Sequence, residues 1–139
     1  MSRAVVELEL ARVLVADGDP ASRLTLKTVL QAGGYAVDTA ASAAEAVGKM
    51  DERAYALVLS DLQMESDEAG LKVLAHARFK DYKPATALVT TYRNREPDSG
   101  GCYLIESENV PELLGMVADL IGARAQKRIN RELRLAGIA

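Results

Sequence analysis

The chain has 139 residues, nearly half of them apolar and few of them aromatic, and a formal net charge of −3. This length suits one compact domain with a single core, and the small net charge argues against a general nucleic-acid binder or a membrane-surface protein. No apolar run approaches the roughly 20 residues of a membrane span, and the acidic N-terminus does not fit a signal peptide. We therefore expect a cytoplasmic protein with no membrane contact and no direct nucleic-acid contact.

Short apolar runs along the chain predict buried strands. Continuous apolar residues without polar alternation are typical of strands covered on both faces, as in a parallel sheet. In chain order the runs are Val13–Ala16, Tyr35–Val37, Leu57–Leu59, Ala85–Val89 and Cys102–Ile105.

Helical patterns lie between these runs. Asp19 followed by Pro20 is typical of an N-cap and first helical position, and Gly33–Gly34 of a helix end. A third helix is expected to begin near Asp67. The side chains predicted to face the core are Leu24, Val29 and Leu30 in the first helix and Leu71, Leu74 and Ala77 in the third.

The alternation of strands and helices predicts an α/β fold: a doubly wound, five-stranded parallel sheet in a three-layer sandwich. The stretch before the last strand, residues 93–101, is polar and contains Pro97 and two glycines, so the fourth helix should be short or missing. We expect an N-terminal extension over residues 1–10, the domain itself over residues 11–122, and a basic amphipathic C-terminal helix or tail over residues 123–139.

Polar residues follow the apolar runs where parallel strands would end. Asp17, Asp61, Thr90 and Glu106 occupy these positions. Ligands of open parallel sheets bind beyond the carboxyl ends of the strands. Because clustered carboxylates repel one another unless a cation lies between them, the pattern fits a hard divalent ion such as Mg²⁺.

Several segments resemble the receiver domains of response regulators. Residues 13–20, Val-Leu-Val-Ala-Asp-Gly-Asp-Pro, are similar to the opening strand and acidic cluster of that family, and residues 55–64 to its phosphoacceptor strand and following loop. Gly70–Leu71 is similar to the start of its third helix, and Leu88–Thr91 to the strand that ends in its switch hydroxyl. The resemblance covers roughly residues 11–122 and implies a flavodoxin-like receiver fold.

By this resemblance, a histidine kinase would phosphorylate Asp61. The family's Mg²⁺ would be held by an acid after the first strand, by Asp61 and by the backbone carbonyl of Gln63. Thr90 would be the switch hydroxyl and Tyr103 the switch aromatic. A receiver is not an enzyme beyond its own self-catalysed phosphoryl transfer, which depends mainly on positioning and charge stabilisation.

Two departures from the family pattern predict a weakened site. Gly18 stands where the family has the acid that ligates the metal directly, which leaves Asp17, the acid that usually works through water. Glu106 stands at the position of a lysine that binds phosphoryl oxygens. We therefore expect at most weak Mg²⁺ binding and impaired phosphorylation, as in a pseudo-receiver.

The sequence thus predicts a stand-alone atypical receiver that acts in phosphorelay signalling through protein–protein contacts. The alternative is a competent receiver, phosphorylated on Asp61 by a histidine kinase with Mg²⁺. A remote alternative is a small nucleotide- or flavin-binding protein, but the first turn, Asp17–Pro20, carries two acids in place of phosphate-binding glycines.

The C-terminal stretch is electrostatically distinct. Residues 123–139 contain five basic residues and one acid, a net +4, whereas residues 1–122 contain 12 basic and 19 acidic residues, a net −7. At helical spacing the basic residues share one face and Ala125, Ile129, Leu133 and Ala136 share the other. The stretch is either a solvated extension of the last helix or a helix for a homodimer or another partner, with nucleic acid or acidic lipid as weaker alternatives.

Overall fold

The computed structural model describes residues 11–61, 64–66, 68–90, 103–106 and 110–137, without the side chains of residue 90 and residues 103–106. In these residues, five parallel strands form one sheet in the order β2-β1-β3-β4-β5. The strands are β1 (Arg12–Ala16), β2 (Ala36–Ala40), β3 (Leu57–Asp61), β4 (Ala85–Thr90) and β5 (Tyr103–Glu106). The helices are α1 (Pro20–Ala32), α2 (Ala43–Glu52), α3 (Ala69–Arg78) and α4 (Val110–Leu135).

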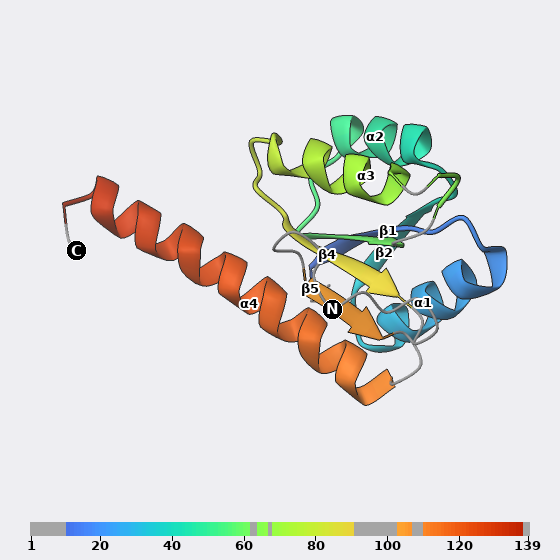
Figure 1. Ribbon diagram of the computed structural model, residues 1–139. Coiled ribbons are helices and arrows are strands. Elements are labelled where there is room, and N and C mark those ends of the chain that lie inside the picture. Colours follow the sequence, from blue (N-terminus) through green and yellow to red (C-terminus); the bar gives the residue numbers. More distant parts are fainter. Residues whose placement is uncertain (1–10, 62–63, 67, 91–102, 107–109, 138–139) are drawn as a thin grey trace, which may run out of the picture.

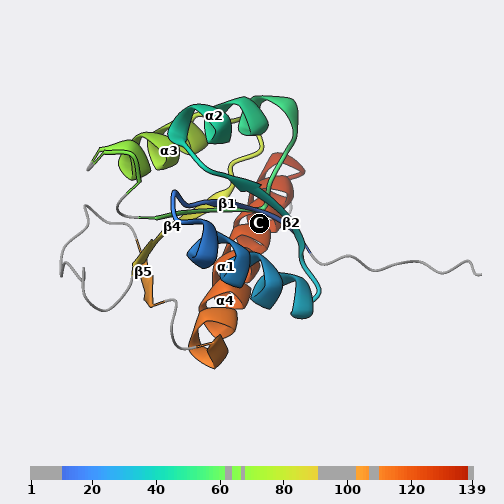
Figure 2. The same cartoon turned by 90° about the vertical axis from the view of Figure 1, so that its right-hand side faces the viewer.

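Two helices cover each face of the sheet, so the molecule has three layers (Figure 1). Helices α2 and α3 lie on one face, and α1 and the first half of α4 lie on the other. The view turned by 90° shows the same arrangement (Figure 2). This arrangement confirms the predicted α/β, flavodoxin-like class. The predicted short or missing fourth helix falls within residues 91–102, outside the described residues.

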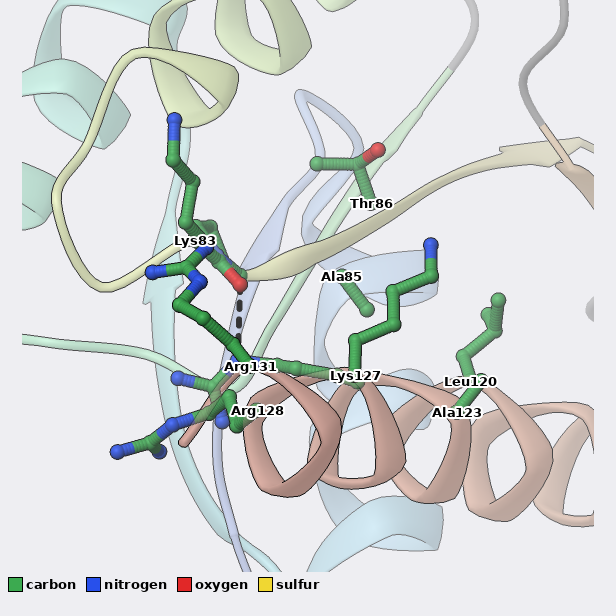
Figure 3. Close-up of a pocket in the computed structure, with 10 residues that line it drawn as sticks. Lys83, Ala85, Thr86, Leu120, Ala123, Lys127, Arg128 and Arg131 are labelled. Atoms are coloured by element: carbon green, nitrogen blue, oxygen red, sulfur yellow. Dashed lines mark hydrogen bonds between the residues drawn. The ribbon is translucent and has the colours of Figure 1, made fainter. Parts of the chain in front are cut away.

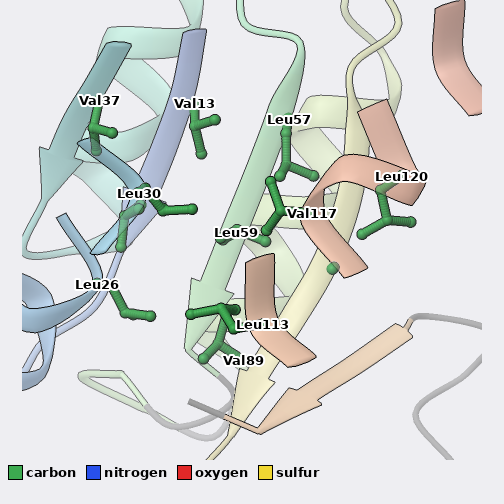
Figure 4. Close-up of a cluster of buried hydrophobic side chains, with 12 residues drawn as sticks. Val13, Leu26, Leu30, Val37, Leu57, Leu59, Val89, Leu113, Val117 and Leu120 are labelled. Carbon is green, nitrogen blue, oxygen red and sulfur yellow. The ribbon is translucent and has the colours of Figure 1, made fainter. Parts of the chain in front are cut away.

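The core between the sheet and the α1–α4 face is built almost entirely from aliphatic side chains (Figure 4). Val13 and Leu59 of neighbouring strands point into it, and Leu30 of α1 and Leu113 of α4 enter from the helices. Burying each such side chain contributes roughly 1.5–3 kcal/mol. These contacts hold α1 and α4 against the strands whose ends carry the predicted site.

Capping residues begin α1 and α2, and those of α1 are the ones that the sequence predicts. The Asp19 side chain accepts a hydrogen bond from the Ala21 N–H, and α1 ends at Gly33, followed by Gly34 with φ 100°. Helix α2 begins after Ser42, whose side chain accepts from the Glu45 N–H.

Two of the predicted core residues are wrong. Leu24 is 64% exposed and Leu71 is 46% exposed, whereas Leu26 of α1 and Val73 of α3 are buried. Several rotations of each helix bring an apolar stripe to the sheet, and the packing against neighbouring elements decides between them. Sequence periodicity alone does not contain that information.

Helix α4 continues without a break across residue 123. Its first half packs on the sheet through Leu113, Val117 and Leu120, and its second half extends beyond the body of the molecule (Figure 1). The basic stretch is therefore helical through Leu135. In the described part of the chain, no helix is long and apolar enough to cross a membrane.

Candidate functional site

The residues singled out at the strand ends lie along one edge of the sheet. Ala16 pairs with Ser60, so Asp17 and Asp61 follow at the same level on neighbouring strands. Asp61 in turn pairs with Val89, and Thr90 pairs with Glu106 on the next two strands. The parallel register thus brings the backbones of all four predicted residues to the same edge.

Tyr103 lies elsewhere along its strand. It opens β5 and pairs with Ala87, whereas Glu106 closes the strand three residues later. The side chains of Thr90, Tyr103 and Glu106 and the whole of Gln63 lie outside the described residues, so their predicted roles stay predictions.

Asp17 is a fixed, buried carboxylate. It is only 2% exposed, and its Oδ1 accepts a hydrogen bond of 2.9 Å from the Asp19 N–H. Its own N–H donates to the Ala40 carbonyl at 2.9 Å, and its carbonyl accepts from Arg23 Nη1 at 2.7 Å. The backbone of Asp17 is thus held on both sides and its carboxylate by one hydrogen bond, and burying a carboxylate costs free energy, which is typical of a site.

Gly18 leaves room for a side chain. A Cβ added at Gly18 would have as its nearest neighbours the Ala41 carbonyl oxygen and Met64 Cα, both 3.8 Å away. These are ordinary van der Waals contacts. The backbone therefore does not require glycine at this position, and the lack of an acid there is a difference in chemistry only.

Gly70 explains how α3 is seated against the end of β3. A Cβ at residue 70 would overlap the Asp61 carbonyl oxygen and crowd Ser60 Oγ at 3.3 Å. Only glycine permits this approach. The Gly70–Leu71 motif of the sequence is thus the contact that fixes the backbone of Asp61, whose side chain is partly buried.

The loop after β3 is tied to the start of α2. The Glu65 carboxylate accepts hydrogen bonds of 3.1 and 3.3 Å from the Ala43 N–H, in the first turn of the helix. A carboxylate there also interacts favourably with the helix dipole. Ser60 Oγ lies 3.5 Å from Met64 Sδ in the same loop. Glu65 thus has a structural role.

Two basic side chains also contact this edge, and neither was predicted from the sequence. Besides the Arg23 contact, Lys49 Nζ donates to the Thr39 carbonyl at the end of β2. Lys49 also lies 3.4 Å from Glu45, one turn away. Arg23 is six residues from Asp17, within the first turn of the helix that follows it, and that spacing is the signal that could have identified it.

The described residues contain no group of three or more acidic, histidine or cysteine side chains that would hold a metal by themselves. Asp17 and Asp61 supply two carboxylates at one edge. A divalent ion there would need backbone carbonyls and water for its remaining ligands, which suits the coordination that Mg²⁺ tolerates.

Comparisons with known proteins agree with this arrangement. The family described as "Response regulator receiver domain" matches residues 13–102. The solved structure of the response regulator TrrA from Thermotoga maritima, in complex with Mg²⁺-BeF, is 34% identical and covers 80% of this chain and 99% of its own, with a TM-score of 0.69.

Other solved structures show the fold. The chemotaxis protein CheY4 from Vibrio cholerae is 23% identical over 80% of this chain and 98% of its own, with a TM-score of 0.68. NtrX from Brucella abortus is 23% identical over 88% of this chain, with a TM-score of 0.78, and the match spans only 29% of NtrX. No curated protein matches the chain.

Proposed function

Because the chain belongs to the family of response regulator receiver domains and thus to two-component signalling, we propose that it is an atypical receiver with impaired phosphorylation chemistry at Asp61. It would signal through contacts with other proteins. Receivers are signalling domains more than enzymes, and any chemistry of this chain would be self-catalysed phosphoryl transfer to Asp61.

The observation that carries the proposal is the incomplete acidic cluster beside Asp61. Gly18 contributes no ligand although the backbone has room for one. Asp17 already uses Oδ1 to accept from the Asp19 N–H. Asp17, Asp61 and the Gln63 carbonyl would hold Mg²⁺, which neutralises charge on a phosphoryl group when bound. With one carboxylate fewer than the family pattern, this site would hold the ion weakly.

Glu106 adds an unfavourable charge to the same edge. Its backbone pairs with Thr90, one residue beyond the level of Asp61. The family resemblance places a lysine there. A like charge about 4 Å from a phosphoryl group costs a few kcal/mol at an effective dielectric near 20. Losing the lysine's attraction would act in the same direction, so the two departures reinforce each other.

The alternative, a competent receiver, is supported by the features of the site that match the family pattern. Asp17 is buried and fixed, Gly70 seats α3 against Asp61, and the register brings Thr90 to the same edge. TrrA, a 34% identical relative, was crystallised with Mg²⁺-BeF. In this reading a histidine kinase phosphorylates Asp61 with Mg²⁺, and Glu106 only slows the reaction.

Labelling with acetyl phosphate separates these readings. We expect the wild-type chain with Mg²⁺ to show little phosphoryl adduct by intact-mass spectrometry, because the ion binds weakly and Glu106 repels the incoming group. Asp61→Asn provides the matched control for labelling elsewhere. Prompt, stoichiometric labelling that Asp61→Asn abolishes would contradict the impaired reading and establish the alternative.

A homodimer through α4 is a further part of the proposal. Ala125, Ile129 and Leu133 recur every four residues along the projecting half of the helix, and Ile129 is 50% exposed. This apolar stripe is partly exposed to solvent in a single chain, and packing against a second copy would bury it.

A further inference from the structure

A groove lined by positive charge lies at the opposite edge of the sheet from Asp61. It is formed by the start of β4 and the residues just before it, and by the middle of α4 (Figure 3). Its volume is about 370 Å³. The five cations that line it are Lys83, Arg124, Lys127, Arg128 and Arg131, and no carboxylate of the described residues lines it.

Arg124 fixes the two walls of the groove to each other. Its guanidinium donates to the Tyr82 carbonyl at 2.7 Å and to the Lys83 carbonyl at 2.9 Å. Burial, and next the charge of Arg128, lower the pKa of Arg124 from its ordinary value. Lys83 has the left-handed φ of 46°, which is costly for a residue with a side chain. The groove is therefore a built feature of the fold.

The four cations that α4 contributes to the groove add charge that the helix itself does not favour. In α4, Arg124 and Arg128 are four residues apart, as are Lys127 and Arg131. Like charges at this spacing destabilise a helix. The ion pairs found between described residues involve none of these side chains. Positive charge that costs stability and forms no ion pair within the described part of the chain is suited to an external anion.

Apolar residues also line the groove. They are Pro84, Ala85, Leu120 and Ala123, and Thr86 is the remaining lining residue. Apolar residues beside cations match a ligand with an apolar group flanked by negative charges. No aromatic side chain of the described residues lines the groove, so it lacks the stacking surface of a single-stranded nucleic-acid site.

We propose that this groove binds an acidic segment of a partner protein, with an apolar side chain of that segment seated over Ala123 and its carboxylates paired with Lys127 and Arg131. The groove is separate from the Asp61 edge, so it would work whether or not Asp61 is phosphorylated. It would therefore give the chain a second contact surface besides the receiver site.

The test is fluorescence anisotropy with a labelled peptide of glutamates around a central leucine. Lys127→Glu with Arg131→Glu should weaken binding at least about tenfold. The matched control, Lys27→Glu with Lys72→Glu, makes the same change in net charge on α1 and α3, and it should leave binding within about twofold. Equal weakening by both variants would mean that only the overall charge attracts the peptide, and would overturn the proposal.

Two further comparisons test the apolar lining of the groove and the class of ligand that it binds. Ala123→Trp, which fills the groove and keeps every cation, should also weaken binding, and replacing the peptide's leucine by serine should do the same. Unchanged or tighter binding by Ala123→Trp would overturn the proposed contact of the peptide's apolar side chain with Ala123.

A single-stranded DNA oligonucleotide tests the class of ligand. If it bound more tightly than the peptide, and Lys127→Glu with Arg131→Glu abolished that binding, the groove would be assigned to nucleic acid and the proposal overturned. Circular dichroism should show every variant folded. In Lys127→Glu with Arg131→Glu, the new carboxylates lie three residues from Arg124, Arg128 and Arg134, a spacing at which opposite charges stabilise a helix.

Discussion

At the residue scale, two tyrosines join elements through hydrogen bonds to acceptors of different charge. The Tyr55 hydroxyl donates to Asp38 Oδ2 at 2.7 Å, beside Arg12 and Arg53, whereas the Tyr82 hydroxyl donates to the Met50 carbonyl at 2.9 Å. Burial, and next the bond to Asp38, raise the pKa of the Tyr55 phenol. Bonds to charged acceptors contribute more than bonds to neutral ones.

Replacing each tyrosine by phenylalanine tests this difference. We expect Tyr55→Phe to lower the free energy of unfolding by about 1–2 kcal/mol, because the Asp38 carboxylate loses a buried donor. Tyr82→Phe should cost about 1 kcal/mol or less. Urea unfolding of both variants beside the wild type gives the comparison. A larger loss in Tyr82→Phe would show that the Asp38 cluster does not stabilise the fold in this way.

Glu45 offers a prediction about pH. Its pKa is lowered first by the Ala41 N–H, which donates to Oε1 at 2.8 Å, and also by Lys49. A carboxyl whose pKa is lower in the folded state stabilises the fold above its unfolded pKa, near 4.3, and loses that contribution as the pH falls through the folded pKa.

Glu45→Gln should keep the cap geometry and lose the charge. Because the side chain is largely exposed, we expect the variant to be less stable than the wild type by only about 0.5 kcal/mol at pH 7. The difference should shrink as the pH is lowered below about 4. Urea midpoints at both pH values provide the measurement, and a deficit that stays constant with pH would mean that the charge of Glu45 is not its cause.

At the element scale, α4 combines a packed half and a projecting half. Leu113, Val117 and Leu120 hold the first half to the sheet, and Arg124 ties the helix to the residues before β4. Beyond Arg124, the helix carries the basic face of the groove and the partly exposed stripe of Ile129 and Leu133. Removing the projecting half should therefore affect association more than folding.

A chain that ends at Ala125 tests this division. We expect it to keep the thermal midpoint within a few degrees, since the buried residues of α4 and the Arg124 hydrogen bonds remain. Sedimentation should give a dimer mass for the full chain and a monomer mass for the shortened chain. Ile129→Glu with Leu133→Glu in the full-length chain is the matched control for the apolar face and should also be a monomer. The same oligomeric state in all three chains would contradict the dimer and favour a solvated extension.

The elements also show what the sequence could and could not predict. The strand ends were predictable, because apolar runs followed at once by Asp17 and Asp61 fix both register and edge. The solvent-facing Leu24 and Leu71 were not, because helix rotation depends on packing partners. The sequence showed the Gly70–Leu71 motif but not why residue 70 is glycine. The cause is the close approach of α3 to the Asp61 carbonyl at the end of β3, which only the structure shows.

At the scale of the whole molecule, opposite charges occupy opposite ends of the strands. Asp17 and Asp61 lie at the carboxyl ends, and the cationic groove lies at the start of β4. The sequence predicted only that charge is uneven along the chain, with a net −7 over residues 1–122 and a net +4 over residues 123–139. It did not predict the groove, because Lys83 and Arg124 are 41 residues apart in the chain.

The impaired chemistry proposed for Asp61 depends on two residues, Gly18 and Glu106. The most direct test is the rate of Asp61 labelling by acetyl phosphate and Mg²⁺ in Gly18→Asp with Glu106→Lys, measured beside the wild type and both single variants. A Cβ added at Gly18 makes only ordinary van der Waals contacts, so the backbone permits the change. We predict labelling at least about tenfold faster in the double variant, with the single variants between. A double variant that labels no faster than the wild type would contradict the claim.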